Sequence, residues 1–530
     1  MFARGGNAVD ALVAAAFVSF VVEPHNCGLG GYGRLTAYVP ARSAFLTVDH
    51  HIRAPRAAHA GMFEIDRAGA ETYYGWPTTV GYANSRGGLA VGVPGAVAGL
   101  VALHERLGRL QFPETVEPAI AAAREGVVVD WEVALAISEA LESVALDEGA
   151  RKLLLAGGRT PKLLAPNAHR LRLDGLSDTL RRIAQDRTAG FYKGPVAHAM
   201  VRAVARRGGV LDLADLEQYK PKIFWEASET FGRCTYATAD DAIAYQTLNM
   251  LQLLPYQAQG PDGLCYRHAL AEVLAHAFAD SMRHYGDPDM VAAPTRALRS
   301  AQYAASRARA ISMTRAAPRP VTAGDPWPYE PQPHGWYAAG GSCAAVQGTS
   351  QVTAIDRDGL AASVITTIAG PFGSGVFVEE GGFFLNNGMQ NFDPRPGRAN
   401  SVAPGKMPIF AAPALVAAAD GRAVLAVGGS GGYRIESAVL HTTVNCLTFG
   451  MSAADAASHP RVHCQGRETI VDSRIPREVR DGLAELGHAV VVVDERPWPV
   501  RFGRVSVVAS AGAHLGAASW PAWSGGAAAT

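Results

Sequence analysis

The feature that most constrains the fold is a change of residue pattern just before residue 349. Apolar side chains in residues 90–315 recur mainly at i, i+3 and i+4, which is typical of amphipathic helices. Residues 316–348 carry six prolines among glycine, alanine and aromatic residues, and neither a helix nor a central strand tolerates that density. From Thr349 onward, short apolar runs bounded by turn residues indicate strands. The sequence therefore predicts an α+β protein with a helix-rich part, residues 1–348, that ends in an exposed linker, and a strand-rich part, residues 349–530.

The same patterns predict individual elements. Asn7 is a suitable N-cap for a first helix, which Glu23-Pro24 ends. Expected helices cover residues 7–22, 96–107, 116–125, 176–186, 196–207, 264–284, 294–312, 434–449 and 476–486. Expected strands cover residues 34–39, 350–356, 360–367, 376–385, 412–418, 423–427, 489–494 and 505–509.

Composition excludes several classes of function. The 530 residues are 48% apolar and 18% charged, which is enough material for one large core or two domains. Basic and acidic residues both number 48, so no net charge attracts nucleic acid or an anionic membrane, and we expect a small-molecule or short-peptide substrate. The six cysteines show neither disulfide-framework nor zinc-site spacing.

The first residues give an expectation about location. The apolar run over residues 11–22 is shorter than the roughly 20 residues that a membrane span needs. The chain as given shows no secretory signal pattern, so a cytoplasmic protein is expected, or a periplasmic one if the natural N-terminus is longer.

A predicted hairpin brings two threonines together. Two strand-like runs flank the loop Arg357-Asp358-Gly359, whose glycine suits the left-handed position of a three-residue turn. If Asp356 faces Leu360, Thr367 falls opposite Thr349, with Cβ atoms about 5 Å apart. A bulge would shift this register by one residue. A structural cross-strand Thr–Thr pair is the alternative to a catalytic pair.

The position of Thr349 favours the catalytic interpretation. It opens its strand directly after the exposed linker, and Gly348 leaves the preceding carbonyl unobstructed. A threonine hydroxyl there can attack the Gly348 carbonyl, and hydrolysis of the ester frees the α-amino group of Thr349. An α-amine has a pKa of about 7.7–8.0, which suits a general base at neutral pH. The sequence thus predicts self-cleavage before Thr349 and a threonine nucleophile.

Three other segments have alternative interpretations. The turn over residues 428–432 lies between a strand and a helix, where its backbone N–H groups can hold an oxyanion, although a plain tight turn has the same sequence. The glycines of residues 28–33 follow a helix instead of a strand, which favours tight packing over a dinucleotide site. Asp49, His50 and His51 suggest a metal site, but adjacent strand residues face opposite ways.

Ordered motifs along nearly the whole chain resemble the gamma-glutamyltranspeptidase family of N-terminal-nucleophile hydrolases. Those in the first part are Gly5-Gly-Asn-Ala-Val-Asp-Ala11, Val22-Glu-Pro-His25, Val93-Pro-Gly-Ala-Val-Ala-Gly-Leu100, Gly190-Phe-Tyr-Lys-Gly194 and Gly286-Asp-Pro-Asp289. Those in the second part are Phe372-Gly-Ser-Gly375, Leu385-Asn-Asn387, Asn391-Phe392, Ala403-Pro-Gly-Lys406 and Gly431-Gly432.

The resemblance implies a four-layer αββα sandwich and a precursor cut between residues 348 and 349, with no metal or organic cofactor. It implies that the two fragments stay associated after cleavage. By position, Thr349 matches the family nucleophile, Thr367 the threonine that hydrogen-bonds to it, and Gly431 and Gly432 the oxyanion-binding amides.

The substrate pocket departs from the family pattern. The resemblance places His51, Arg53, Asn387 and Asn391 at this pocket, with His51 where the family has an arginine for the substrate α-carboxylate. Arg53, two residues on, would point to the same side of a strand as His51 and replace the lost charge. The other exchanged positions that the resemblance identifies are Gly388, Asn391, Phe410 and Ala411. A glutamyl group would lose charge-assisted hydrogen bonds worth about 1.5–3 kcal/mol each.

The family motif Asp-Pro-Arg near the end is replaced by Trp520-Pro521-Ala522, and the family's Ser-x-Gly turn is missing near residues 242–247. The leading hypothesis is an autoprocessing threonine amidohydrolase or acyltransferase with altered acyl specificity. The alternatives are a genuine γ-glutamyl hydrolase or transferase with a rebuilt pocket, and an uncleaved, inactive relative that acts as a binding protein.

Overall fold

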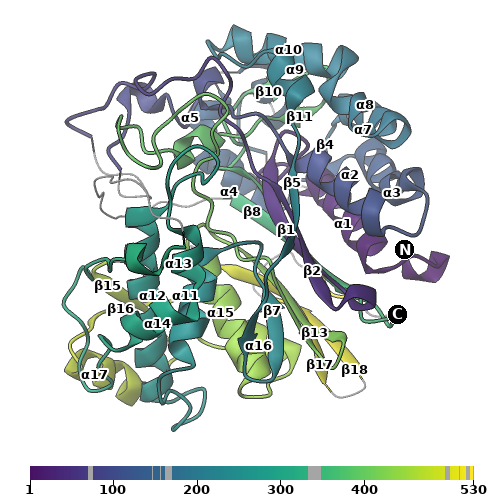
Figure 1. Ribbon diagram of the computed structural model, residues 1–530. Helices are drawn as coiled ribbons and strands as arrows, with labels where there is room; N and C mark the ends of the chain where they lie inside the picture. The colour runs from purple at the N-terminus through teal and green to yellow at the C-terminus, as the bar shows by residue number, and fades with distance from the viewer. Residues whose placement is uncertain are drawn as a thin grey trace.

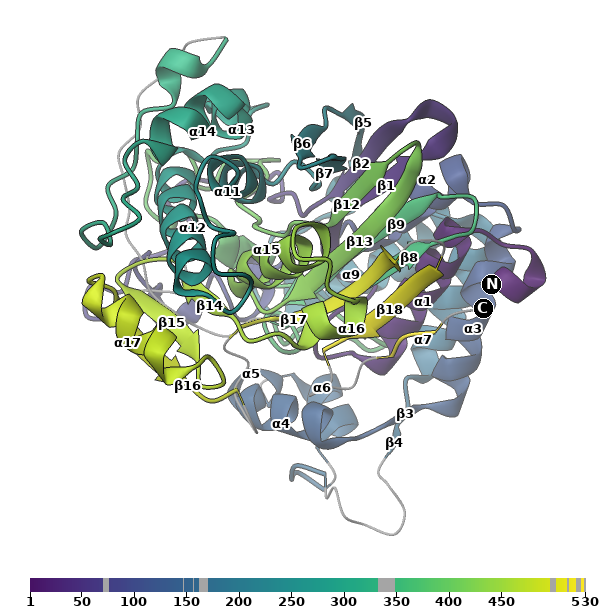
Figure 2. The same cartoon turned by 90° about the horizontal axis from the view of Figure 1, so that it is seen from below.

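Two sheets stacked face to face, with helices on both outer sides, form the body of the protein (Figures 1 and 2). The computed structural model describes residues 1–69, 76–145, 147–155, 157–161, 170–331, 348–495, 502–511, 514–520 and 526–528. Residues 332–347 of the linker, which include Cys343, lie outside these ranges, as do Pro521 and Ala522. The four-layer αββα sandwich that the resemblance implied is confirmed.

The first sheet has the strand order β5-β2-β1-β9-β8, and its neighbours are antiparallel. Strand β8 lies at its edge. The members are β1 (Tyr32–Val39), β2 (Ala44–His50), β5 (Lys222–Glu226), β8 (Gly348–Ile355) and β9 (Ala361–Ala369).

The second sheet has the order β18-β17-β13-β12-β7-β6. Strand β13 of this sheet packs across β8 and β9 of the first, and β12 packs across β1. The members are β6 (Glu229–Phe231), β7 (Cys234–Ala237), β12 (Leu415–Ala419), β13 (Arg422–Ser430), β17 (Arg504–Ala511) and β18 (His514–Ser519).

One helical layer covers the outer face of the first sheet. Helix α1 lies against β8 and β9, α2 lies against β1 and β2, and α3 and α7 pack farther out (Figure 2). This layer and its extensions comprise α1 (Ala8–Val22), α2 (Ala96–Leu107), α3 (Phe112–Glu125), α4 (Trp131–Glu139), α5 (Leu141–Val144), α6 (Glu148–Leu154), α7 (Asp174–Asp186), α8 (Ala189–Tyr192), α9 (Gly194–Arg206) and α10 (Leu213–Gln218).

The other helical layer covers the second sheet. Helix α15 lies on β13 and β17, α16 on β17 and β18, and α11 and α12 pack behind α15 (Figure 2). The members are α11 (Ala242–Leu251), α12 (Leu264–His284), α13 (Thr295–Arg299), α14 (Ala301–Ala308), α15 (Arg434–Leu447) and α16 (Ala453–Ser458).

A small unit inserted between α16 and β17 lies beside α12. Its strands follow the order β14-β15-β16, and helix α17 packs against β16 and α12. The bounds are β14 (Val462–Cys464), β15 (Glu468–Asp472), β16 (Ala489–Val493) and α17 (Arg477–Glu485). Two short pairs lie elsewhere, namely β3 (Val127–Val128) with β4 (Arg170–Leu171) and β10 (Phe377–Val378) with β11 (Phe383–Phe384).

Local signals explain the elements that the sequence predicted well. Asn7 caps α1 because its side chain accepts from Val9 N and Asp10 N, while Asp10 accepts from Asn7 N. Helices α2 and α12 have the predicted bounds, and α3, α7, α9, α15 and α17 begin or end within a few residues of theirs. None of the described helices is long and apolar enough to cross a membrane.

Two predictions about elements were wrong, and some strands were missed. The helix expected over residues 294–312 is broken at Ser300, whose hydroxyl accepts from Tyr303 N and starts α14. The strand expected over residues 376–385 is only the β10–β11 pair, because a turn at Gly381 and Gly382 interrupts it. The helix-rich first part supplies β1, which was predicted, and also β2 and β5 of the first sheet and β6 and β7 of the second, which were not.

Candidate active site

Thr349 lies at the start of edge strand β8, as predicted. The predicted hairpin register is confirmed from Ser350, opposite Thr366, to Ile355, opposite Ala361. At the start of the strand the register shifts by one residue, so that Gly348 pairs with Ala369 and Thr349 lies within the bulge. The bulge that was considered from the sequence is therefore present, and it still leaves the two threonine hydroxyl oxygens 3.5 Å apart.

The Gly348 carbonyl oxygen accepts two hydroxyl hydrogen bonds. Thr349 Oγ1 donates to it at 2.8 Å and Thr367 Oγ1 at 2.5 Å. Thr367 Oγ1 in turn accepts from Ala369 N at 2.7 Å, which directs the hydroxyl proton of Thr367 toward the carbonyl. All three residues are buried. The geometry polarises the carbonyl and keeps a hydroxyl beside the carbon that it would attack.

The segment that follows α1 lies directly against Gly348. A Cβ atom added to Gly348 would lie 2.8 Å from Asn26 Oδ1 and 3.0 Å from the His25 carbonyl oxygen. The hydrogen bonds from Ile368 N to Asn26 O and from Phe372 N to His25 O fix this segment. Glycine at position 348 is therefore required for close approach of the backbone.

A polar network next to this contact was missed by the sequence reasoning. Glu23 accepts from Ser350 Oγ at 3.2 Å and from Asn26 Nδ2 at 3.3 Å. Desolvation raises the pKa of Glu23, although His25 and Arg504 oppose the shift. Arg504 also forms an ion pair with Glu132. The Val22-Glu-Pro-His25 motif was the available signal, but spacing alone did not show that it contacts the peptide between Gly348 and Thr349.

A cavity of about 1310 Å³ runs along β8 and reaches Thr349. Residues of α1, β8, β17 and β18 line it, including Ser19, Glu23 and Arg504. A water molecule or a ligand can therefore approach Thr349 through this cavity.

The glycine turn of residues 428–432 connects β13 to α15. Gly428 packs over β8 and β9, since an added Cβ would lie 3.1 Å from Ser363 Oγ and 3.3 Å from Gln351 Cβ. Gly431 and Gly432 have φ values of 128° and 61°, and their N–H groups have no acceptor among the described residues. These two amides are available to a ligand, as an oxyanion site requires.

His51 lies in an aromatic cluster instead of a charged pocket. Its ring stacks on Tyr32 at 4.7 Å and meets Phe410 edge-on at 4.7 Å. Burial lowers the pKa of His51 well below its usual value, so the ring is neutral. Asn391 donates to the Tyr32 hydroxyl at 2.9 Å. The structure thus brings the predicted residues His51, Asn391 and Phe410 together around Tyr32.

The placement of Arg53 corrects one sequence argument. Strand β2 ends at His50, so strand alternation does not relate Arg53 to His51. The Arg53 guanidinium instead forms an ion pair with buried Asp287 at 3.2 Å and is 20% exposed. Lys222 lies 3.7 Å from the same carboxylate. Lys222 also pairs with Asp289, so the two cations share two carboxylates and the charge of Arg53 is balanced.

Asn387 forms hydrogen bonds to two other loops. Its Oδ1 accepts from Gly370 N at 2.9 Å and its Nδ2 donates to Ser85 O at 2.9 Å. Gly388 lies against Ile52 and Asn386, and the partly buried Ala411 follows Phe410. Asn387 holds backbone segments near the cluster, and no described contact joins it to the two threonines.

A second buried cation was missed, and no sequence motif marked it. Arg34 lies opposite Asp49 in the β1–β2 ladder, with an ion pair of 3.2 Å, and donates to Phe410 O and Tyr285 OH. Burial alone would raise the pKa of Asp49, but the adjacent Arg34 holds it below its usual value.

The glycines of residues 28–33 and the segment Asp49–His51 are packed against neighbouring elements. Glycines of residues 28–33 pack tightly, since a Cβ on Gly31 or Gly33 would lie 2.4 or 2.1 Å from carbonyl oxygens of β9. Asp49, His50 and His51 do not converge on a metal position among the described residues. His50 lies against α2 at Gly99, whereas His51 lies between Tyr32 and Phe410.

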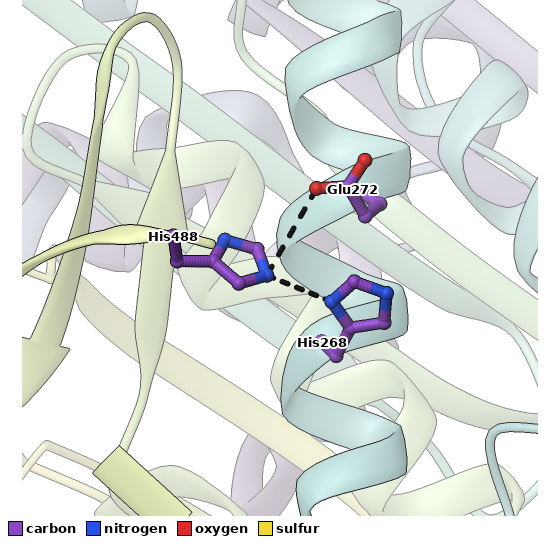
Figure 3. Close-up of side chains that lie close together, drawn as sticks. All are labelled: His268, Glu272 and His488. Atoms are coloured by element: carbon purple, nitrogen blue, oxygen red, sulfur yellow. Dashed lines mark hydrogen bonds and ion pairs between the residues drawn. The ribbon is translucent and has the colours of Figure 1, made fainter. Parts of the chain in front are cut away.

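One group with metal-ligating side chains occurs elsewhere in the described chain. His268 and Glu272 on α12 lie near His488, which precedes β16 (Figure 3). His268 Nε2 contacts Ser312 O at 2.7 Å, so this nitrogen must carry a proton and Nδ1 accepts from His488 Nε2 at 2.7 Å. His488 Nδ1 then accepts from Thr469 Oγ1 at 3.0 Å. Arg319 forms an ion pair with Glu272. The group is a satisfied neutral hydrogen-bond chain beside a balanced ion pair.

This interpretation predicts the effect of His488→Phe. The substitution keeps a ring but leaves buried His268 Nδ1 without the donor from residue 488 and leaves Thr469 Oγ1 only its contact with Cys464 Sγ, at a cost of about 1–3 kcal/mol. The melting temperature should fall, while His59→Phe on the surface should leave it unchanged. Added zinc should not raise the wild-type melting temperature. A zinc-dependent rise that His488→Phe abolishes would contradict the hydrogen-bond interpretation.

Comparison with known proteins agrees with this fold. The model of the family Gamma-glutamyltranspeptidase matches residues 1–530. The Acylase ACY 1 proenzyme of Pseudomonas sp. (strain V22) is 33% identical over 495 residues, which cover 92% of this chain and 84% of that protein. The glutathione hydrolase proenzyme of Bacillus subtilis (strain 168) is 30% identical over 493 residues, covering 92% and 81%.

Solved structures share the fold. A cephalosporin acylase from Bacillus halodurans superposes with a TM-score of 0.82 at 23% identity, covering 99% of this chain and 93% of that chain. A Helicobacter pylori gamma-glutamyltranspeptidase superposes with a TM-score of 0.53 at 26% identity, covering 60% and 88%. These likenesses place the protein in the class of N-terminal-nucleophile hydrolases. Within that class, the chain belongs to the gamma-glutamyltranspeptidase family and is an enzyme related to acylases and glutathione hydrolases.

Proposed function

We propose that the chain is a precursor that cleaves its own peptide bond between Gly348 and Thr349, and that the freed Thr349 is the nucleophile of an amidohydrolase or acyltransferase. The observation that carries the proposal is the pair of hydroxyl hydrogen bonds, from Thr349 and Thr367, to the Gly348 carbonyl. The proenzyme names of the relatives support it. Residues 1–348 and 349–530 become the two fragments, which stay associated because both contribute strands to each sheet and meet there as the antiparallel pairs β1–β9 and β12–β7.

Self-cleavage proceeds through an ester. Thr349 Oγ1 rotates from the carbonyl oxygen toward the carbon and forms a C–O bond there, while its proton passes to water. Thr367 donates to the developing oxyanion. The C–N bond breaks as the nitrogen takes up a proton, and water then hydrolyses the ester. The products are a Gly348 carboxylate and a Thr349 residue with both a hydroxyl and a free amine.

Turnover repeats this chemistry on a substrate amide. The α-amine of Thr349 accepts the hydroxyl proton, the oxygen attacks the substrate carbonyl, and the amine of the substrate leaves with a proton. The Gly431 and Gly432 N–H groups, which have no acceptor among the described residues, hold the oxyanion. Water or an amine then takes the acyl group from the threonyl ester. No step requires a metal or organic cofactor.

The neutral pocket favours an acylase over a γ-glutamyl enzyme. Arg34 is paired with Asp49, Arg53 with Asp287, and His51 is neutral, so a glutamyl zwitterion finds no unbalanced cation there. We propose amides of uncharged acids as substrates. A glutathione-like substrate is the second candidate, which the glutathione hydrolase relatives favour.

Two measurements on the purified protein test this function. Denaturing electrophoresis and intact-mass analysis should give two fragments, with the smaller one beginning at Thr349. The processed protein should release amine from at least one member of an anilide panel that includes γ-glutamyl and uncharged acyl groups. A single full-length band without hydrolysis would instead support an inactive binding protein, and a γ-glutamyl anilide as best substrate would support the second candidate.

Thr367→Val should slow both processing and turnover. Valine keeps the β-branched shape but removes the hydroxyl that donates to Gly348 O, so we expect processing to slow about 10²–10³-fold, as for loss of one oxyanion donor. Turnover should fall as well, because the same hydroxyl lies 3.5 Å from Thr349 Oγ1 and orients the nucleophile. Stability should change little. Thr366→Val, which alters the neighbouring hydroxyl that donates to Tyr32 O, is the matched control. Equal effects of the two substitutions would return Thr367 to a structural role.

A further inference from the structure

Four residues form a row across the first sheet that starts at the nucleophile. Thr349 in β8 lies beside Thr367 in β9, which is the register partner of Tyr32 in β1. His51 continues the β1–β2 register by one residue beyond His50, which pairs with Gly33. Opposed strand residues share a face and lie about 5 Å apart at Cα. The Tyr32 side chain therefore lies on the same sheet face as Thr367, one strand beyond it and two strands from Thr349.

Three contacts hold the Tyr32 ring in this position. It stacks on His51 at 4.7 Å with an interplanar angle of 19°, meets Phe410 edge-on at 5.2 Å, and its hydroxyl accepts from Asn391. His51 and Phe410 also contact each other at 4.7 Å. The three rings are between 1% and 8% exposed. Such mutual packing leaves no depth behind Tyr32 for a long chain.

The charges around the rings are balanced. Arg34 lies two residues after Tyr32 on the same strand face and pairs with Asp49. Arg53 pairs with Asp287. A carboxylate brought to this wall would lose its hydration without gaining an unbalanced cation, which disfavours anionic acyl groups.

We infer that Tyr32, backed by His51 and Phe410, closes the acyl pocket, so that the enzyme hydrolyses amides of short, uncharged carboxylic acids. This inference rests on the proposed threonine chemistry and adds the size and charge of the acyl group. Tyr32 is the residue that sets the limit, because it is the ring nearest to Thr367 in the row.

The test is a series of anilides whose acyl group lengthens from acetyl through butyryl and hexanoyl to octanoyl, with glutaryl and γ-glutamyl anilides as charged members. Wild-type kcat/KM should be highest for the short members and fall at least about tenfold from butyryl to hexanoyl, since a single excess methylene in a closed pocket costs about 10–200-fold. Tyr32→Ala should raise the hexanoyl-to-acetyl ratio at least about tenfold by opening the row.

Matched variants separate pocket shape from stability. Tyr38→Ala removes an equally buried ring at the other end of β1 and should leave the ratio unchanged. Tyr32→Leu removes less of the side chain and serves as a second variant if Tyr32→Ala does not fold. The dependence of wild-type kcat/KM on acyl length tests the inference without any substitution. Long or charged substrates preferred by the wild type, or an unchanged ratio in both Tyr32 variants, would overturn the inference. Fragment analysis of the same samples shows separately whether processing before Thr349 occurs, so failure of the proposed function is recognised independently.

Discussion

A Thr349→Ala chain is expected to remain one polypeptide of 530 residues and to hydrolyse no amide above background. Alanine has no hydroxyl to attack the Gly348 carbonyl, so neither the ester nor the free α-amine forms. Loss of a nucleophile costs on the order of 10⁶-fold in kcat in serine hydrolases, and here the base is lost with it. Intact-mass analysis and an anilide assay measure the two effects.

Two control variants, Thr349→Ser and Thr353→Ala, show whether the effect depends on the hydroxyl at position 349. Serine keeps the hydroxyl and should still be cleaved, with a rate that reflects its freer rotamer. Thr353 lies on the same strand opposite Ser363, so its loss tests hydroxyl removal away from the scissile bond. Cleavage of Thr349→Ala, or a wild-type small fragment that begins at another residue, would remove Thr349 from the role of nucleophile.

The threonine hairpin was predictable because its determinants are local. Gly359, with φ of 85°, allows the three-residue loop, and the loop length sets the register of the strands on both sides. The one-residue shift at Gly348 was not determined by the loop. It occurs where the backbone meets Asn26 and the His25 carbonyl, from a segment more than 300 positions earlier.

Strands such as β2 were missed because both of their faces are buried. Strand β2 packs against helix α2, and six of its seven residues Ala44–His50 are buried, so the alternation of Leu46 and Val48 with Thr47 and Asp49 does not separate a buried face from an exposed one. A sequence pattern detects burial on one face, and a strand in the interior of a four-layer sandwich lacks that signal.

The contacts of the pocket residues were also only partly predictable from the sequence. The resemblance identified His51, Asn391 and Phe410 as exchanged positions, but not the ring that joins them. Tyr32 contacts all three from a different strand, within a glycine-rich segment whose obvious interpretation was tight packing. Arg53 was assigned a free charge because its partner Asp287 lies 234 positions away. Contacts at such separation are decided by topology, which one sequence does not specify.

Gly348→Ala should fold but process slowly. The added Cβ would lie 2.8 Å from Asn26 Oδ1 and 3.0 Å from the His25 carbonyl oxygen, so either the segment after α1 or the scissile peptide must move. A displacement of about 1 Å from reactive geometry can cost on the order of 10²-fold, and we expect a similar fall in the cleavage rate. A time course on denaturing gels measures it.

Two further variants show whether the effect is positional. Gly61→Ala is the matched control, because a Cβ at Gly61 meets no atom within 4 Å. Adding Asn26→Ala to Gly348→Ala removes the nearer obstacle and should recover part of the rate, while the His25 backbone oxygen keeps recovery incomplete. Chains that do mature should turn over substrate at the wild-type rate, since residue 348 takes no part in the reaction of the freed threonine. Wild-type processing of Gly348→Ala would show that the contact with Asn26 and His25 does not position the scissile peptide.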